Sequence, residues 1–424
     1  MGPAFTPLFR SVPLALALSA VLPSLPALAA GPRHAAADER PDECSRVTRE
    51  YPLWTEESGC IDAPWNASDP AAGTFPLYYE LSRPKGPSIA DLIVFHGGPG
   101  YPRRHLQRGG ELWESLRAHC TILYFHQRGS GFSARVADAS ALAGREGLFT
   151  LDRIVDDTWL LHQELLGGHP AVLVGKSAGG FLAMKFALAH PESTRSLVLA
   201  ATSPHHGYIS RRNAVKTGFF LSLDERWPGF LAALGRARAY LDRADADDIG
   251  PLAALPVRED LLESMFFDLA YTLDGQFEMV AMARDLAERR FGLFLARAAA
   301  GKETLRPTGL ESDAVLNLIT CRELRFADAN PLACSNQSEG ELYDLRDRLH
   351  ELSVPVLVLS GRYDPILPPP FQEEIVRNLP GMPEWHVLEL SSHMLFEEQP
   401  KACTVYILDF LGIPRQQLPQ SPGL

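Results

Sequence analysis

The stretch "AVLVGKSAGGFLAMKFALAH" at residues 171–190 limits the possible folds of this chain more than any other. A run of small and branched apolar residues stops at Gly175, and a helix-like run follows directly after Ser177. The serine stands in a G-x-S-x-G pattern that Gly179 completes. A residue on such a sharp strand-to-helix turn has a strained backbone, and the flanking glycines remove side chains that would clash. The pattern therefore predicts a serine hydroxyl presented at the carboxyl end of a sheet, beside the N-terminus of a helix.

Other apolar runs alternate with helical patterns on both sides of this turn. Residues 151–168 have the spacing of a helix that stops at Gly167, and residues 399–412 resemble a final helix. Apolar strands separated by helices predict an α/β domain with a mostly parallel sheet covered on both faces. The strand-like stretches are residues 76–82, 90–98, 120–131, 171–175, 196–202, 353–365 and 384–394.

The pattern changes near residue 205. From 205 to 350 the chain is rich in Ala, Leu, Arg and Asp at helical spacing and has few strand-like runs, which predicts a helical cap inserted into the α/β domain. We expect the core of this α/β domain in two parts, 76–204 and 351–415. An extended lead-in at 30–75 would wrap the surface, and a loose tail would occupy 416–424.

The N-terminal segment has the features of an export signal. One basic residue, Arg10, precedes an apolar stretch that prolines interrupt and that ends in "ALA" at 27–29. This order predicts a secretory signal peptide over residues 1–29 and an exported protein, periplasmic or secreted. An uncleaved anchor is the alternative, although the apolar run is short for a membrane span. Once the signal is cleaved, we expect no membrane association.

Six cysteines become informative in an oxidising compartment. Their spacing favours two local disulfides, Cys44 with Cys60 and Cys321 with Cys334, and lacks the C-x-x-C pattern of zinc or redox sites. The remaining Cys120 and Cys403 either pair with each other or stay buried as thiols. The net charge of -12 argues against nucleic acid as a partner.

A serine hydroxyl is a weak nucleophile without a base. Asp364 follows one apolar run in "LSGRYDP", and His393 follows the next in "LELSSHM". The order Ser, Asp, His is that of α/β-hydrolases, and the ends of parallel strands meet at one edge of the sheet. His393 would take the proton from Ser177 and return it to the leaving group, while Asp364 would hold the imidazole in the required tautomer.

The run "HGGPG" at 96–100 follows the strand-like "LIVF". Its glycines allow a backbone N–H to face the site, as an oxyanion hole requires. We expect the two donors to be the N–H groups of Gly98 and of Ala178, the residue after the nucleophile. We expect no metal, because the adjacent His205 and His206 cannot easily share one ion and no third ligand is evident. No cofactor is needed for this chemistry.

The motifs "HGGPG", "QRGSG" at 127–131, "GKSAGG", "GRYD" and "SSHM" together resemble those of the proline iminopeptidase family of α/β-hydrolases. The export signal, the length and the cysteine-bearing cap are similar to its secreted aminopeptidase and tripeptidyl-aminopeptidase branch. The resemblance covers residues 76–202 and 353–412 well and the cap poorly. It implies the same nucleophile, oxyanion hole, Asp and His as above. Two departures are His126, where the family has Asp, and Ala178, where a larger side chain is frequent.

The resemblance also implies that acidic groups of the cap bind a free substrate amine, because a buried ammonium needs a carboxylate partner. The segment "LITCRELRF" at 318–326 is similar to a cap segment of that branch in which an acidic residue stands two positions after a cysteine. This would make Glu323 the amine anchor, on a loop held by the Cys321–Cys334 disulfide. Glu225 and Glu278 are weaker candidates.

The sequence thus predicts an exported serine aminopeptidase that removes one residue, proline among the candidates, or a short peptide from a free N-terminus through an acyl-enzyme. One alternative is an esterase, lactonase or amidase that acts on a small molecule, since the same triad cleaves esters and the cap sets specificity. A non-catalytic binding protein on this scaffold is the other, and the complete Ser177, Asp364 and His393 set argues against it.

Overall fold

A computed structural model describes residues 44–102, 106, 111–207, 212–243, 269–296, 310–324, 334 and 341–413. The predicted signal peptide at 1–29 and the predicted tail at 416–424 lie outside these residues.

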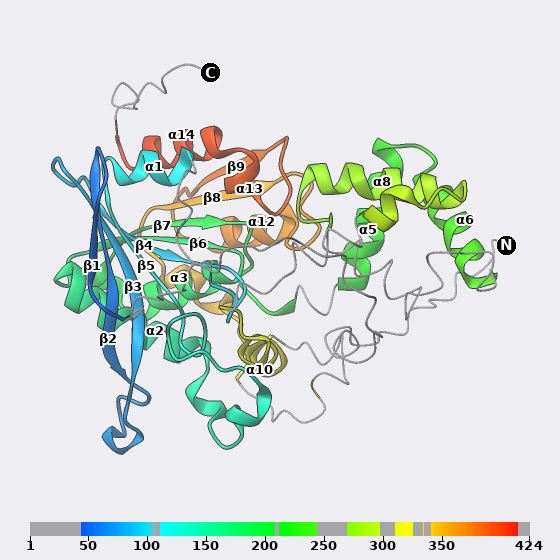
Figure 1. The fold of residues 1–424 in the computed structure, drawn as a ribbon. Helices are drawn as coiled ribbons and strands as arrows, with labels where there is room; N and C mark the ends of the chain where they lie inside the picture. The colour runs from blue at the N-terminus through cyan, green and yellow to red at the C-terminus, as the bar shows by residue number, and fades with distance from the viewer. Residues whose placement is uncertain are drawn as a thin grey trace, which may run out of the picture.

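A nine-stranded sheet in the order β1-β2-β3-β5-β4-β6-β7-β8-β9 forms the centre of the fold (Figure 1). Six neighbouring strands run parallel to one another, namely β5, β4, β6, β7, β8 and β9. At one side of the sheet, β1, β2 and β3 pair antiparallel with one another, and β3 pairs antiparallel with β5. The mostly parallel sheet of an α/β-hydrolase is therefore confirmed. The strands are β1 Val47–Glu50, β2 Trp54–Pro64, β3 Thr74–Pro84, β4 Asp91–Phe95, β5 Thr121–Phe125, β6 Ala171–Lys176, β7 Thr194–Ala200, β8 Val356–Gly361 and β9 Glu384–Leu388.

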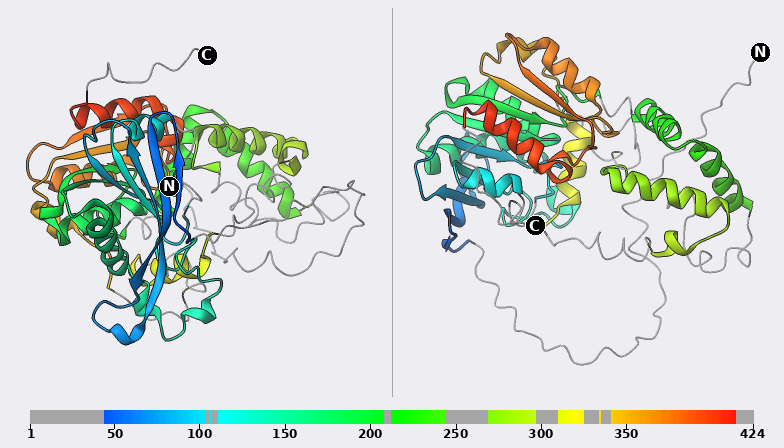
Figure 2. Two further views of the ribbon diagram at one scale, coloured as in Figure 1. Left: turned by 60° about the vertical axis from the view of Figure 1, so that its left-hand side comes forward. Right: turned by 90° about the horizontal axis from the view of Figure 1, so that it is seen from above.

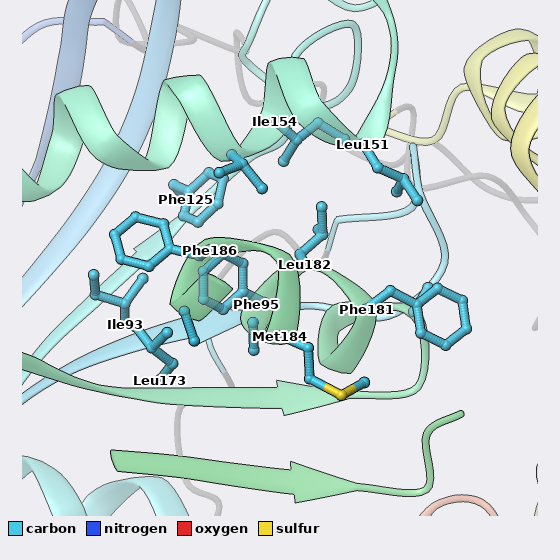
Figure 3. Packing of buried hydrophobic residues seen from close by; sticks show 14 of the residues in the cluster. Ile93, Phe95, Phe125, Leu151, Ile154, Leu173, Phe181, Leu182, Met184 and Phe186 are labelled. Carbon is cyan, nitrogen blue, oxygen red and sulfur yellow. The ribbon is translucent and has the colours of Figure 1, made fainter. Parts of the chain in front are cut away.

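Helices cover both faces of this sheet. Successive residues of a strand point to opposite faces, so Ile93 and Phe95 pack under α2 and α3, while Leu92 and Val94 pack under α1 and α14 (Figures 1 and 3). This two-sided burial explains why the parallel strands are continuous apolar runs. The covering helices are α1 Glu111–Arg117, α2 Leu151–Leu166, α3 Ala178–Ala189, α12 Pro369–Asn378, α13 Leu395–Glu398 and α14 Pro400–Phe410. Short 3-10 helices lie at Pro70–Ala72, Ala139–Leu142, Glu146–Leu148, Pro191–Ser193 and Arg346–Glu351.

The predicted lead-in differs from expectation. Residues 47–64 form β1 and β2 and extend the sheet instead of wrapping its surface. Alternate residues of β2 are buried, but the buried positions include Glu56 and Ser58 as well as Trp54. Because polar side chains occupy that inward face, an apolar pattern with a period of two is absent from the sequence.

The cap region consists of helices in the part that the structure describes. α5 Arg212–Arg226, α6 Phe230–Arg243 and α8 Leu273–Ala287 lie beyond the carboxyl ends of the parallel strands (Figures 1 and 2). They share a separate apolar cluster that includes Phe230 and Met279. α10 Asp313–Glu323 differs, since its Val315 and Leu318 belong to the core cluster of the sheet. The cap limits of 205 and 350 stay a prediction.

Two disulfides join the predicted pairs, Cys44 with Cys60 and Cys321 with Cys334. Cys120 and Cys403 are free thiols in the apolar layer under α1 and α14, and burial raises the pKa of each to about 12. Within the described residues, no helix has the length and the hydropathy needed to cross a membrane.

Candidate active site

The backbone at Ser177 has the strained geometry that the sequence predicts. The residue lies between β6 and α3 with φ +56° and ψ −128°, a conformation that residues other than glycine rarely adopt. A Cβ atom on Gly179 would lie 2.1 Å from the carbonyl oxygen of Phe95 in β4, so α3 can approach the sheet only because that side chain is missing. The N–H of Ser177 donates to the carbonyl of Ala200 at 2.9 Å. Neighbouring strands thus fix the turn from outside.

The loop at 96–100 passes beside Ser177, the predicted nucleophile. A Cβ atom on Gly97 would lie 2.9 Å from the Cβ atom of Ser177, so bare backbone faces the serine here. Gly98 has φ +66°, which lets the chain turn within this loop. The N–H groups of Gly98 and Ala178 are still the predicted oxyanion donors.

Helix α10 contacts the far end of the same loop. The N–H of Ser312 donates to the carbonyl of Gly100 at 2.8 Å, and the hydroxyl of Tyr101 donates to the carboxylate of Asp313. Burial, followed by this contact with Asp313, raises the pKa of the Tyr101 hydroxyl. The first turn of α10 therefore helps to fix the loop that borders Ser177.

Asp364 and His393 meet at the same edge of the sheet. Asp364 lies three residues after β8 and His393 five residues after β9, and both side chains are buried. The Nδ1 atom of His393 lies 2.8 Å from Oδ2 of Asp364. The other carboxylate oxygen accepts the N–H groups of Ile366 at 2.8 Å and Leu367 at 3.0 Å. Because the carboxylate can only accept, Nδ1 carries the proton and Nε2 is left to act as a base.

Ser177 and His393 line one pocket of about 540 Å³. Aromatic side chains of Trp113, Tyr124 and Phe396 supply much of the remaining wall. Lys176 and Glu397 add an ion pair to it, with Nζ 3.0 Å from Oε2. The described lining of the pocket is thus largely apolar, and it includes one pair of opposite charges together with Ser177. This ion pair was not predicted, although Lys176 occupies the variable position of "GKS".

The structure does not bring Glu323 to this pocket. Its buried carboxylate accepts the N–H of Leu151 at 3.1 Å, at the N-terminus of α2, and it is not among the residues that line the cavity. Burial raises the pKa of Glu323 to about 7, although the Leu151 N–H and Lys185 act in the opposite direction. The residue ends α10 and contacts the N-terminus of α2, so its placement follows from this packing and not from the resemblance of residues 318–326 that suggested the role.

The weaker candidates also lie elsewhere. Glu225 is exposed on α5, and Glu278 is half-buried on α8; neither lines the pocket. His205 contacts Glu374 with Nε2 3.1 Å from the carboxylate, while Nδ1 of His206 lies 2.9 Å from the Tyr343 carbonyl oxygen. Among the described residues, no group of three or more His, Cys, Asp or Glu side chains could hold a metal ion.

The departure at His126 has a local explanation. The imidazole is buried, accepts the N–H of Phe132 at 3.1 Å through Nδ1, and packs against the Tyr78 ring. The following loop is held by Arg128, which makes two hydrogen bonds of 2.7 and 2.6 Å to Asp157 of α2. A buried bidentate pair of this kind supports the loop without an aspartate at position 126.

Comparisons with known proteins support the fold. A family model described as the alpha/beta hydrolase fold matches residues 92–238. A proline iminopeptidase of Saccharolobus solfataricus is 30% identical over 125 residues, which is 30% of this chain and 37% of that protein. A proline iminopeptidase of Clostridioides difficile is 22% identical over 339 residues, 80% of this chain and 95% of that protein.

A solved proline iminopeptidase of Mycobacterium smegmatis has a TM-score of 0.53 and 20% identity, with 84% of this chain and 98% of that chain covered. This likeness supports the fold. The chain matches only 37% of the length of the Saccharolobus solfataricus protein and 43% of the length of a proline iminopeptidase of Pestalotiopsis fici. The chain therefore has the α/β-hydrolase fold, and it is similar in sequence to proteins named proline iminopeptidases.

Proposed function

We propose that this protein is a serine hydrolase that acts as an aminopeptidase on peptides with a free N-terminus. The observation that carries the proposal is the buried hydrogen bond of 2.8 Å between His393 and Asp364, with His393 and the strained Ser177 in one pocket. The aminopeptidase part of the proposal comes from the relatives, which are named proline iminopeptidases.

The chemistry follows from the positions of these groups. Ser177 Oγ attacks the carbonyl carbon of the scissile amide while its proton passes to Nε2 of His393. The carbonyl oxygen becomes an oxyanion that the N–H groups of Gly98 and Ala178 stabilise. His393 then returns the proton to the leaving amine as the C–N bond breaks, which leaves an acyl-enzyme. A water molecule, deprotonated by His393, attacks that ester and releases the N-terminal fragment.

Recognition of the free amine requires a carboxylate or a comparable acceptor. Of the described residues that line the pocket, Glu397 supplies the acidic side chain, and it is paired with Lys176. A substrate ammonium would therefore share this carboxylate with Lys176. Glu323 would serve only if α10 moved away from α2, because its carboxylate contacts the Leu151 N–H.

We also propose that the chain is exported. The two disulfides Cys44–Cys60 and Cys321–Cys334 are compatible with an oxidising compartment. N-terminal sequencing of protein recovered from the medium and the periplasm tests this. Cleavage after Ala29 in these fractions would support it, and recovery of the protein from the cytoplasm alone would contradict it.

The test of activity compares matched chromogenic amides that differ only in a free or an acetylated N-terminus, with p-nitrophenyl esters in parallel. We expect hydrolysis of the free-amine amides, loss on acetylation, and loss of turnover in Ser177→Ala. Ester turnover without amide cleavage, or equal turnover of free and acetylated amides, would contradict the aminopeptidase proposal and favour an esterase with a cap. Full activity of Ser177→Ala would exclude Ser177 as the nucleophile.

A further inference from the structure

Gln276 of the cap helix α8 links the cap to both catalytic loops. Its side chain is fully buried, and its Nε2 atom lies 3.1 Å from the carbonyl oxygen of Tyr363 and 3.0 Å from the hydroxyl of Ser392. These two residues directly precede Asp364 and His393 in the chain. A single amide group therefore contacts the neighbours of both members of the hydrogen-bonded pair.

The contacts form a closed hydrogen-bond group. Nε2 of Gln276 also lies 3.0 Å from the carbonyl of Ala270, and the Ser392 hydroxyl reaches the carbonyls of Ala270 and Tyr363 at 2.9 and 3.1 Å. Gln276 supplies two protons and Ser392 one, which is enough for each of the two carbonyls and the hydroxyl oxygen to accept a proton. The other end of the amide, Oε1, accepts Arg226 at 2.8 Å, which fixes the orientation of the group.

The chain just before Gln276 reinforces this link. The Tyr271 ring meets the His393 ring edge-on with 5.2 Å between centroids, and the Tyr271 carbonyl accepts the N–H of Met394 at 3.2 Å. The carboxylate of Glu398 accepts the N–H of Leu273 at 2.6 Å and that of Ser392 at 2.7 Å. The start of α8 and the His393 loop thus share partners on both sides of the imidazole.

We propose that Gln276 is a positioning residue, which holds the Asp364 and His393 loops at the separation that the Nδ1–Oδ2 hydrogen bond requires. The inference rests on the proposed serine hydrolase function. Gln276 touches neither the pocket surface nor the reacting atoms, and it acts through Tyr363 and Ser392. Groups that hold catalytic side chains through a second set of hydrogen bonds have large effects on rate, because small errors in geometry are costly.

The test compares Gln276→Met, which keeps the length of the side chain but removes both N–H donors, with Met279→Ala one turn further along α8. Met279 is fully buried in the cap cluster and is not part of the Gln276 group, so its loss weakens the cap without altering these contacts. The probe is a fluorophosphonate, which bonds phosphorus to Ser177 Oγ and releases fluoride. Its rate of labelling reports the alignment of Ser177 and His393 without any peptide substrate.

We expect Gln276→Met to lower the labelling rate and kcat by about 10- to 100-fold with KM changed less than about twofold. Met279→Ala should lower the melting temperature and leave the labelling rate within about twofold of the wild type. Labelling of Gln276→Met at the wild-type rate would overturn the inference. An equal loss of labelling in Met279→Ala would also overturn it, because cap stability alone would then explain the effect.

Ser392→Ala gives a second measurement if Gln276→Met does not fold. It removes one hydroxyl from the same group, and we expect a smaller loss of labelling. A further variant, Gln276→Glu, keeps an oxygen for Arg226 but loses the NH2 group, and its loss of labelling should not be additive with that of Ser392→Ala. Full additivity would count against a shared group. If the wild-type protein is labelled but does not cleave the peptide amides, only the proposed substrate class is rejected. If Ser177→Ala is labelled, the assignment of Ser177 as the nucleophile is rejected.

Discussion

The carboxyl edge of the sheet and the cap both border the proposed catalytic residues, but they fix these residues by different means. At the sheet edge, backbone pairing sets the positions: Lys176 is level with Ala200 in β7, and Ala200 is level with Leu359 in β8. In the cap, individual side chains such as Gln276 make the contacts. Backbone pairing tolerates most substitutions, whereas a side-chain contact is lost with one residue.

The largest effect is expected from Asp364→Asn at the sheet edge. The amide would keep an oxygen for the N–H groups of Ile366 and Leu367 and would turn its NH2 toward His393, which then takes the wrong tautomer. We expect kcat to fall by roughly 10³- to 10⁴-fold with little loss of stability. Kinetics and thermal unfolding check this, with the exposed Asp62→Asn as control. A loss below about tenfold would show that Asp364 does not orient the base.

Gly179→Ala tests the backbone constraint at the elbow. The new Cβ would lie 2.1 Å from the Phe95 carbonyl oxygen, and because that atom belongs to β4 it cannot move aside cheaply. We expect a loss of about 3 kcal/mol or more in the free energy of unfolding, at the upper end of overpacking effects. Urea unfolding measures it. Wild-type stability in this variant would mean that α3 can shift away from the sheet at little cost.

The two regions also differ in how far they could be predicted from the sequence. Parallel strands place their following loops at one edge, so Ser177, Asp364 and His393 could be assigned together from motif order. Glu323 could not, because its location depends on the packing of α10 against α2, which local spacing does not encode. Gln276 gave no signal, since a glutamine on a helix is usually solvated. β2 was missed because Glu56 and Ser58 occupy buried positions.

Glu323→Gln examines the contact between α10 and the core. Burial raises the pKa of Glu323 from 4.5 to about 7, so the folded protein binds this proton more tightly than the unfolded chain. The contribution of Glu323 to the free energy of unfolding is therefore fully present below pH 4.5 and is lost as the pH rises through about 7. The loss is on the order of 3 kcal/mol.

The glutamine variant can still accept the Leu151 N–H but does not titrate. Its stability should therefore change less than that of the wild type between pH 5 and pH 8. Urea midpoints of both proteins over this range give the comparison. Parallel pH profiles would show that Glu323 ionises in the folded protein as it does in the unfolded chain.

The smallest effect is expected from Gly235→Ala, the same substitution as at the elbow but in the cap. Gly235 is exposed within α6, and a Cβ atom there would meet nothing within 4 Å. Alanine should stabilise the helix by about 0.5–1 kcal/mol, because it loses less backbone entropy on folding. Thermal unfolding followed with the labelling rate of Ser177 measures both regions at once.

α6 packs against α8, which carries Gln276. A higher melting temperature with unchanged labelling would mean that α8 already holds the catalytic loops fully in place. A change in labelling would instead show that motion of α6 reaches the triad through Gln276. In that case the division between a sheet edge fixed by backbone and a cap fixed by side chains would describe two coupled parts of one catalytic unit.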